Sequence, residues 1–242
     1  MLPLFPPTPS ALLLAALFLL LARPGGAAAG EARLDLAGVR EIEIAGDAAH
    51  VRLTTGGGPA EARLGTRREG WFARWYSSWF YNDCRSDSRM WVAGTVLHVN
   101  VVTPSAFEAS DCVVEVTARL PEGAAVRIGL DAVEARLDGR FGVLDLGTRA
   151  GDVTLNGAVE TAELSGAALR ARLDLAGAAE RAPRELRLSA GALDATVDLG
   201  AAAPVGWRVD AKAALVDTSR PNDPSAPTQL AVSGDYVRLT LR

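Results

Sequence analysis

The sequence predicts an all-β protein, and within that class a single-stranded β-solenoid with coils of about 20 residues. Between about 126 and 200, apolar side chains alternate with Arg, Asp, Glu or Thr, as in 133–139, 169–177 and 193–200. This alternation is typical of strands with one buried and one solvated face. Glycines that close the strands stand at positions 139, 147, 157, 166, 177, 191 and 200. Two successive glycine intervals together span 18 to 25 residues, a repeat length that indicates stacked coils.

The residue types also fit a solenoid. Glycine suits the corners of a coil because it adopts positive φ without steric cost. Small alanines at inward positions, Ala135, Ala171 and Ala195, fit a narrow interior. An antiparallel β-sandwich is the alternative, because it also places strands about 8 to 12 residues apart. However, the array contains one Asn-Gly pair, Asn156-Gly157, and a sandwich would use such two-residue hairpin turns more often.

Strands are also expected outside the array. Those before it occupy 32–36, 41–44, 50–54, 95–102 and 112–120, with turns at 56–59 and 120–123. After it come a strand at 207–215, a loop at 220–227 and a final strand at 236–241. The final strand carries Arg238, Thr240 and Arg242 on its polar face. It is therefore expected to be the charged outer strand that protects an open end of the stack.

Composition limits the classes of function. The chain has 242 residues, of which 49% are hydrophobic but only 6% aromatic. This predicts one domain with a thin core of Val, Leu and Ala. The formal net charge is −4 and the isoelectric point is about 5.3, which argues against a nucleic-acid partner.

The N-terminus predicts export. Residues 11–22 form an apolar run of 12, which suits a signal peptide but is too short for a transmembrane helix. The alanines at 27–29 offer a cleavage site, so 1–29 is the predicted signal peptide and 30–242 the mature domain. That domain is expected in the periplasm, at the cell surface or outside the cell, with no transmembrane span after cleavage. The segment Met1–Ser10 lacks a basic residue, so a retained N-terminal anchor is the alternative.

Two cysteines, Cys84 and Cys112, favour a structural disulfide in an exported protein. Closing the loop between them would contribute about 3 to 4 kcal/mol. A metal site would need more ligands than these cysteines and the only histidines, His50 and His98, provide. No metal or other cofactor is expected. His50 begins a strand on its polar phase and is expected at the surface.

The segment 65–92 interrupts the strands as an aromatic insert that also contains Cys84. Its rings either cap an end of the core or form an exposed platform that binds sugar rings or a membrane interface. Arginines flank it, which would suit an anionic polysaccharide or lipid headgroup. The residues of this possible binding platform are Trp71, Arg74, Trp75, Tyr76, Trp79, Phe80 and Tyr81.

The motifs at 150–155, 164–173, 189–197 and 233–239 resemble the DUF4097 family, which comprises adhesin-like, head-GIN-type domains of exported bacterial proteins. The resemblance covers 33–64 and 95–242, whereas the aromatic insert departs from it. It implies a right-handed β-solenoid and an adhesin-like function. It transfers no catalytic residue.

Three functions are therefore considered. The favoured one is a non-enzymatic envelope or surface protein that binds a protein or polysaccharide of the cell envelope, or acts as a scaffold. One alternative is a polysaccharide-active β-helix enzyme, which would need clustered carboxylates on one polar face. The other is a membrane-tethered accessory protein. The carboxylates considered are Asp138, Asp145, Asp152, Asp174, Asp194 and Asp198.

Overall fold

The computed structural model describes residues 27–28, 32–36, 38–68, 84, 86–104, 112–178, 182–200 and 204–242. Strands account for 78% of these residues. The only helical element among them is a 3-10 turn, η1 (Ala176–Ala178). The predicted all-β class is confirmed, and within the described ranges no helix is long and apolar enough to cross a membrane.

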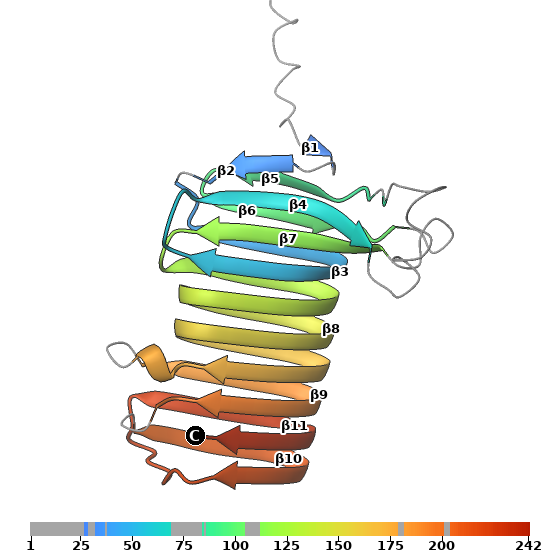
Figure 1. Cartoon of the computed structure of the whole chain (residues 1–242). Coiled ribbons are helices and arrows are strands. Elements are labelled where there is room, and N and C mark those ends of the chain that lie inside the picture. The colour runs from blue at the N-terminus through green and yellow to red at the C-terminus, as the bar shows by residue number, and fades with distance from the viewer. Residues whose placement is uncertain are drawn as a thin grey trace, which may run out of the picture.

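The strands belong to one mixed sheet. In chain order they are β1 (Ala27–Ala28), β2 (Ala32–Asp35), β3 (Glu41–Thr55), β4 (Glu61–Arg68), β5 (Arg89–Ala93), β6 (Val96–Val101), β7 (Cys112–Leu120), β8 (Ala124–Asp174), β9 (Glu185–Asp198), β10 (Val205–Thr218) and β11 (Thr228–Leu241). The main path of the sheet runs β1-β5-β6-β3-β8-β9-β11-β10. From β6 to β10 the successive pairings are parallel. In Figure 1 these strands appear as turns of ribbon stacked one on the next.

The spacing of side-chain contacts gives the length of one turn. Within β8, Asn156 donates to Asp138 across 18 positions, and Arg170 pairs with Asp152 at the same separation. The next step is longer, because Leu169 lies beside Leu193 of β9. Neighbouring segments of the sheet are therefore separated by 18 and then by 24 residues of sequence.

Glycines allow the turns to approach closely at the corners. Gly157 has a φ of +134°, and an added Cβ would collide with the carbonyl oxygen of Gly139 in the neighbouring turn. Gly46 has a φ of +131° and lies equally close to the carbonyl oxygen of Val101. The sequence pattern predicts separate strands at 41–44 and 50–54, but both segments belong to one strand, β3.

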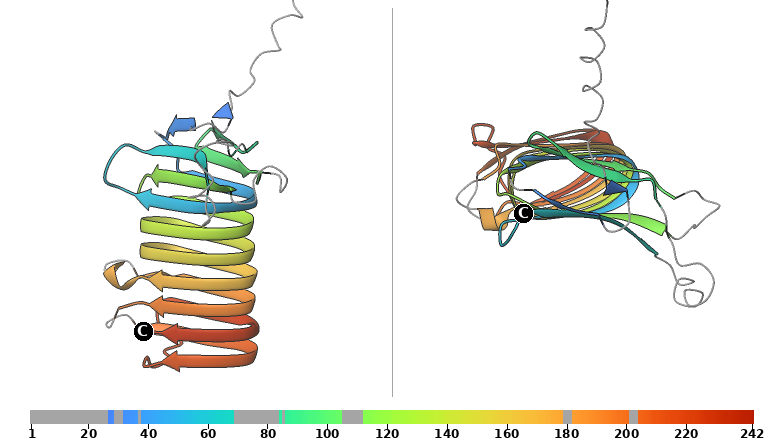
Figure 2. Two further views of the ribbon diagram at one scale, coloured as in Figure 1. Left: turned by 45° about the vertical axis from the view of Figure 1, so that its right-hand side comes forward. Right: turned by 90° about the horizontal axis from the view of Figure 1, so that it is seen from above.

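The interior is aliphatic and thin, as the low aromatic content predicts. The view along the stack in Figure 2 shows a flattened, elongated cross-section. Ala135, Ala171 and Ala195 are at most 1% exposed, which confirms their inward placement. Phe141 is the largest fully buried side chain among the described residues.

At both ends the order of strands in space differs from their order in the chain. β3 lies between β8 on one side and β6 and β7 on the other. β11 lies between β9 and β10. The expectation that the last strand of the sequence forms the end of the stack is therefore wrong, because the outer strand is β10.

The loop that connects β10 to β11 contains Asp223, whose pKa is lowered by hydrogen bonds from the hydroxyl and backbone N–H of Ser225.

The opposite end carries antiparallel strands. β5 pairs with β6, β4 with β7, and β2 with β4. β1 pairs with β5, so the alanines of the predicted cleavage site lie beside Met90 and Arg89. Cleavage after residue 29 would remove β1 from this edge. Residues 1–26 lie outside the described part, so the signal peptide stays a prediction.

Candidate functional site

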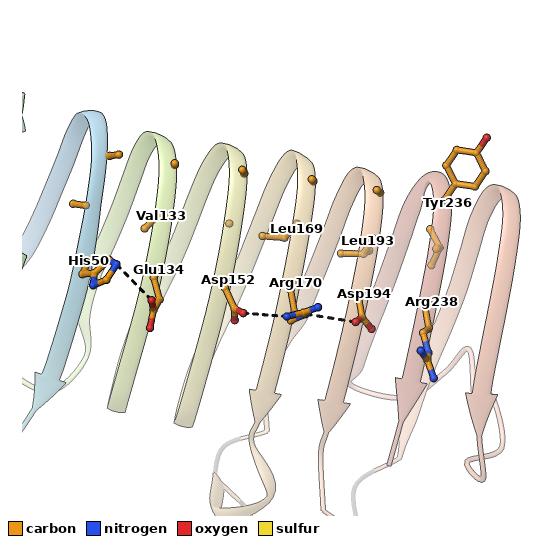
Figure 3. A pocket seen from close by; sticks show the side chains of 18 of the residues that line it. His50, Val133, Glu134, Asp152, Leu169, Arg170, Leu193, Asp194, Tyr236 and Arg238 are labelled. Carbon is orange, nitrogen blue, oxygen red and sulfur yellow. Dashed lines mark ion pairs between the residues drawn. The ribbon is translucent and has the colours of Figure 1, made fainter. Parts of the chain in front are cut away.

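A groove of about 1050 Å³ runs along the outside of the stack. Each turn contributes three consecutive residues, which lie beside the equivalent residues of the next turn (Figure 3). In spatial order the triplets are 48–50 of β3, 132–134, 150–152 and 168–170 of β8, 192–194 of β9, 236–238 of β11 and 213–215 of β10. The groove thus extends over seven successive strand segments rather than lying between two elements.

The first residue of each triplet is almost always alanine. Ala132, Ala150, Ala168 and Ala192 are exposed, and they leave a shallow path across the turns. At this position β11 carries Tyr236 in place of alanine, beside Ala192. Tyr236 is 70% exposed and projects from the ribbon in Figure 3. The path of small residues therefore has an aromatic ring near its C-terminal end.

The second residue of each triplet forms the apolar floor. Val133, Leu169, Leu193 and Val237 are between 3% and 6% exposed. Gly151 interrupts this row, and a Cβ there would lie 3.1 Å from a methyl carbon of Leu169. The glycine therefore makes room for its larger neighbours, so that the floor stays closed over the core.

The third residue of each triplet is charged along most of the groove. His50 lies 3.5 Å from Glu134. Arg170 lies 3.6 Å from both Asp152 and Asp194 (Figure 3). These are distances between side-chain nitrogen and carboxylate oxygen. Arg170 thus lies between two carboxylates on neighbouring turns, whereas Glu134 and Asp152 are like charges on neighbouring turns of this wall.

The C-terminal end of the groove differs from the rest. Arg238 is exposed and forms no ion pair with a described residue, although it lies beside Asp194 in the strand register. Leu215 is 62% exposed and lies beside Arg238 on β10. Together with Tyr236, they give this end an aromatic ring, an aliphatic side chain and an uncompensated positive charge.

We expect replacement of Arg170 by Leu to lower the free energy of unfolding by no more than about 1 kcal/mol, because the side chain is exposed. The loss comes from the two ion pairs to Asp152 and Asp194 and leaves the repulsion between these carboxylates, although Asp152 keeps Arg172 as a partner at 3.1 Å. Salt screens such repulsion, so the difference from wild type should shrink at 1 M NaCl in urea-unfolding curves. A loss that stays constant with salt would instead indicate a packing role for Arg170.

The predicted disulfide is present and lies at the N-terminal end of the groove. Cys84 and Cys112 are bonded, with Cα atoms 5.7 Å apart, and Cys112 also lines the groove. Arg68, the last residue of β4, pairs with Cys112 in the sheet. Arg68 and Cys84, the described residues on either side of 69–83, therefore both lie beside Cys112.

The residues of the predicted aromatic platform lie outside the described part of the chain: Trp71, Arg74, Trp75, Tyr76, Trp79, Phe80 and Tyr81. Of the predicted insert, residues 65–68 belong to β4 and residues 89–92 belong to β5. Trp91 of β5 stacks on His98, with ring centroids 5.3 Å apart.

The carboxylates considered for catalysis do not converge. Asp152 and Asp194 reach the groove, where Arg170 lies between them. Asp138 accepts a hydrogen bond from the side-chain amide of Asn156, and Asp174 accepts one from the backbone N–H of Ala176. Among the described residues, no group of three His, Cys, Asp or Glu side chains could hold a metal ion.

The sequence predicts Asp152 and Asp194 as candidate site residues, but it does not predict the groove triplets as one surface. They recur as Ala-Val-Glu, Ala-Gly-Asp, Ala-Leu-Arg and Ala-Leu-Asp at 132, 150, 168 and 192. Their spacing of 18, 18 and 24 residues matches the turns of the stack, so the signal was present. The same repeated triplets also fit a series of unrelated strand starts, because the sequence does not show that they share one face. His50, expected only as a surface histidine, belongs to the same row.

Comparisons with known proteins add two structural likenesses. No protein-family model matches the chain, and no curated protein sequence matches it. A solved structure from Clostridium sporogenes, named a "putative cell adhesion protein", aligns with a TM-score of 0.46 at 11% identity, over 88% of this chain and 99% of that one. A "putative adhesin" from Bacteroides fragilis aligns with a TM-score of 0.45 at 10% identity, over 88% and 95%. Likenesses at this level do not indicate what the present chain binds.

Proposed function

We propose that this chain is an exported, non-enzymatic, adhesin-like envelope protein that binds an extended polymer along its groove. The observation that carries the proposal is the repetition of the groove lining, one triplet in every turn, of which four successive ones begin with alanine and end with a charged residue. A site that repeats with the turns suits a ligand that itself repeats, such as a polysaccharide of the cell envelope. The periplasm or the cell surface is the proposed location, and the disulfide is compatible with it.

The proposed architecture is a single right-handed β-solenoid. The parallel register from β3 to β10 and the side-chain contacts 18 positions apart support it. Successive turns would then lie about 4.8 Å apart, which is the spacing of neighbouring strands. An antiparallel sandwich requires hairpins between successive strands, whereas β9 pairs in parallel with both of its neighbours.

The chemistry at the C-terminal end of the groove favours an anionic glycan. The exposed ring of Tyr236 provides an apolar face for a sugar ring, with its hydroxyl as a polar handle. Arg238, which has no ion pair with a described residue, can form charge-assisted hydrogen bonds to a carboxylate or sulfate. Along the remaining turns Arg170 offers hydrogen-bond donors, and Glu134, Asp152 and Asp194 offer acceptors, on one wall of the alanine path.

The aromatic segment is the proposed second contact for the same ligand. Its two ends meet the stack at Cys112, which lines the N-terminal end of the groove. The platform comprises Trp71, Arg74, Trp75, Tyr76, Trp79, Phe80 and Tyr81. A polymer lying in the groove would pass this point of attachment, so rings there would extend its contact area.

Binding to an array of envelope polysaccharides, acidic and neutral, tests the function. We expect the wild type to bind at least one acidic polysaccharide on this array. Filling the alanine path with the variant Ala168→Trp should weaken this binding about tenfold or more, equivalent to about 1.4 kcal/mol. Ala168 is exposed, so the larger ring does not enter the core.

Val143→Trp is the matched control, because Val143 is 44% exposed on β8 but does not line the groove. It should bind as the wild type does. The double variant Trp75→Ala, Trp79→Ala tests the aromatic platform separately from the groove. If this variant and the wild type bind equally, the platform is rejected and the groove remains the proposed site. Equal binding of Ala168→Trp and wild type, or no retention on any polysaccharide, would reject the groove as the binding site.

A further inference from the structure

The outer edge of β10 is an open end of the sheet. β10 pairs with β11 from Val205 to Thr218, and no other described strand pairs with its second edge. Such an edge presents unpaired backbone groups to other chains, and most proteins cover or shorten theirs. At 14 residues, β10 is longer than most strands.

Hydrogen bonds at the start of β10 show which backbone groups face this edge. Trp207 donates its backbone N–H to the side chain of Asn222, and the carbonyl of Val205 accepts from Asp223. Both bonds go to the connecting loop rather than to β11. Because backbone groups alternate in direction along a strand, Val209 and Ala211 also face the open edge.

Three of the four exposed charged residues of β10, Arg208, Asp210 and Asp217, form no ion pair with a described residue. Arg208 and Asp217 form no ion pair with a described residue, since Ala231 and Thr240 lie beside them on β11. In the interior of the stack, equivalent charges are paired across turns, as in Arg187–Glu163 (3.9 Å). Asp210 is a further exposed anion of β10 without an ion pair among the described residues. Arg208 and Asp217 are one cation and one anion that a further turn of the same kind could neutralise.

These charges lie symmetrically about the corner of β10. Lys212 and Ala213 form the corner and both are exposed. On either side of it, Val209 and Val216 pack against the core. A two-fold axis through this corner exchanges the two arms of β10.

We propose that a second copy of this chain docks on this edge, end to end, with the two β10 strands antiparallel. The axis then places Arg208 opposite Asp217 of the second copy, and Val209 opposite Val216 of the second copy. Each pair occurs twice, as a self-complementary interface requires. Lys212, closest to the axis, is neutralised within its own chain by Asp235 at 2.8 Å.

The opposite end of each stack carries antiparallel strands, so this contact closes on itself and does not extend into a fibre.

Sedimentation equilibrium of the full chain, purified from the exported fraction, tests the proposal. The wild type should show a concentration-dependent monomer–dimer equilibrium. In the dimer, Asp217→Arg would place an arginine opposite Arg208 of the other copy at both symmetric positions. The dissociation constant of the dimer should therefore rise at least tenfold. The charge swap Arg208→Asp, Asp217→Arg should restore the dimer, because each anion again faces a cation.

Asp145→Arg is the control for the change in net charge, because Asp145 is exposed on β8, far from the edge. It should dimerise as the wild type does. A cysteine at Ala213 lies next to the axis, so Ala213→Cys should be cross-linked to its own copy by a short bis-maleimide. A strictly monomeric wild type, or a dimer unaffected by Asp217→Arg, would overturn the proposal.

Discussion

Replacement of Gly157 by alanine is expected to lower the free energy of unfolding by about 3 kcal/mol. Two costs combine at this corner. The φ of +134° disfavours any residue with a Cβ. The new Cβ would also meet the carbonyl oxygen of Gly139 in the neighbouring turn, so the two turns would have to separate.

Gly129→Ala is the matched control in the same strand. Gly129 does not have a positive φ, and an added Cβ would find nothing within 4 Å. Its effect should stay within about 0.5 kcal/mol of zero. Urea-unfolding curves followed by far-UV circular dichroism measure both variants. Equal stabilities for the two would show that close contact between turns does not limit this corner.

Removing the disulfide is the second change with a large expected effect. Cys84→Ser together with Cys112→Ser should lower the free energy of unfolding by about 3 kcal/mol, because the bond closes a loop of nearly 30 residues in the unfolded chain. The sequence separation is 28. Thermal unfolding of the double variant, compared with that of the oxidised wild type, measures the loss.

The reduced wild type provides a control without mutation. Its unfolding midpoint should match that of the double variant, since both lack only the covalent link. Oxidised and reduced wild type with the same midpoint would contradict the expectation. Polysaccharide binding by the reduced protein is also informative, because the bond joins the aromatic segment to Cys112 at the groove.

Much of the fold follows from local sequence patterns. The alternation around Ala135, Ala171 and Ala195 specifies which side chains point inward, because the side-chain period of a strand leaves one choice. Cys112–Leu120 was predicted with the bounds that β7 has in the structure. The disulfide also followed from the sequence, since only two cysteines are present.

The order of the turns depended on tertiary structure. Local pattern does not show that β11 lies between β9 and β10, because both placements bury the same alternating side chains. The choice is made by long-range parallel pairing, in which β11 pairs with β9 across more than 40 positions. For the same reason the charged edge was assigned to Arg238 and its neighbours when it belongs to β10.

The groove also depended on tertiary structure. Each triplet, such as Ala168-Leu169-Arg170, is an ordinary strand segment on its own, and its residues act as a surface only when turns of 18 and 24 residues bring equivalent positions together. The sequence by itself determined strands, inward faces, glycine corners and the covalent link, because these depend on neighbours in the chain or on residue identity. Only the stacking decided which charges meet, where the groove runs and which strand is left open, because those depend on contacts between residues far apart in sequence.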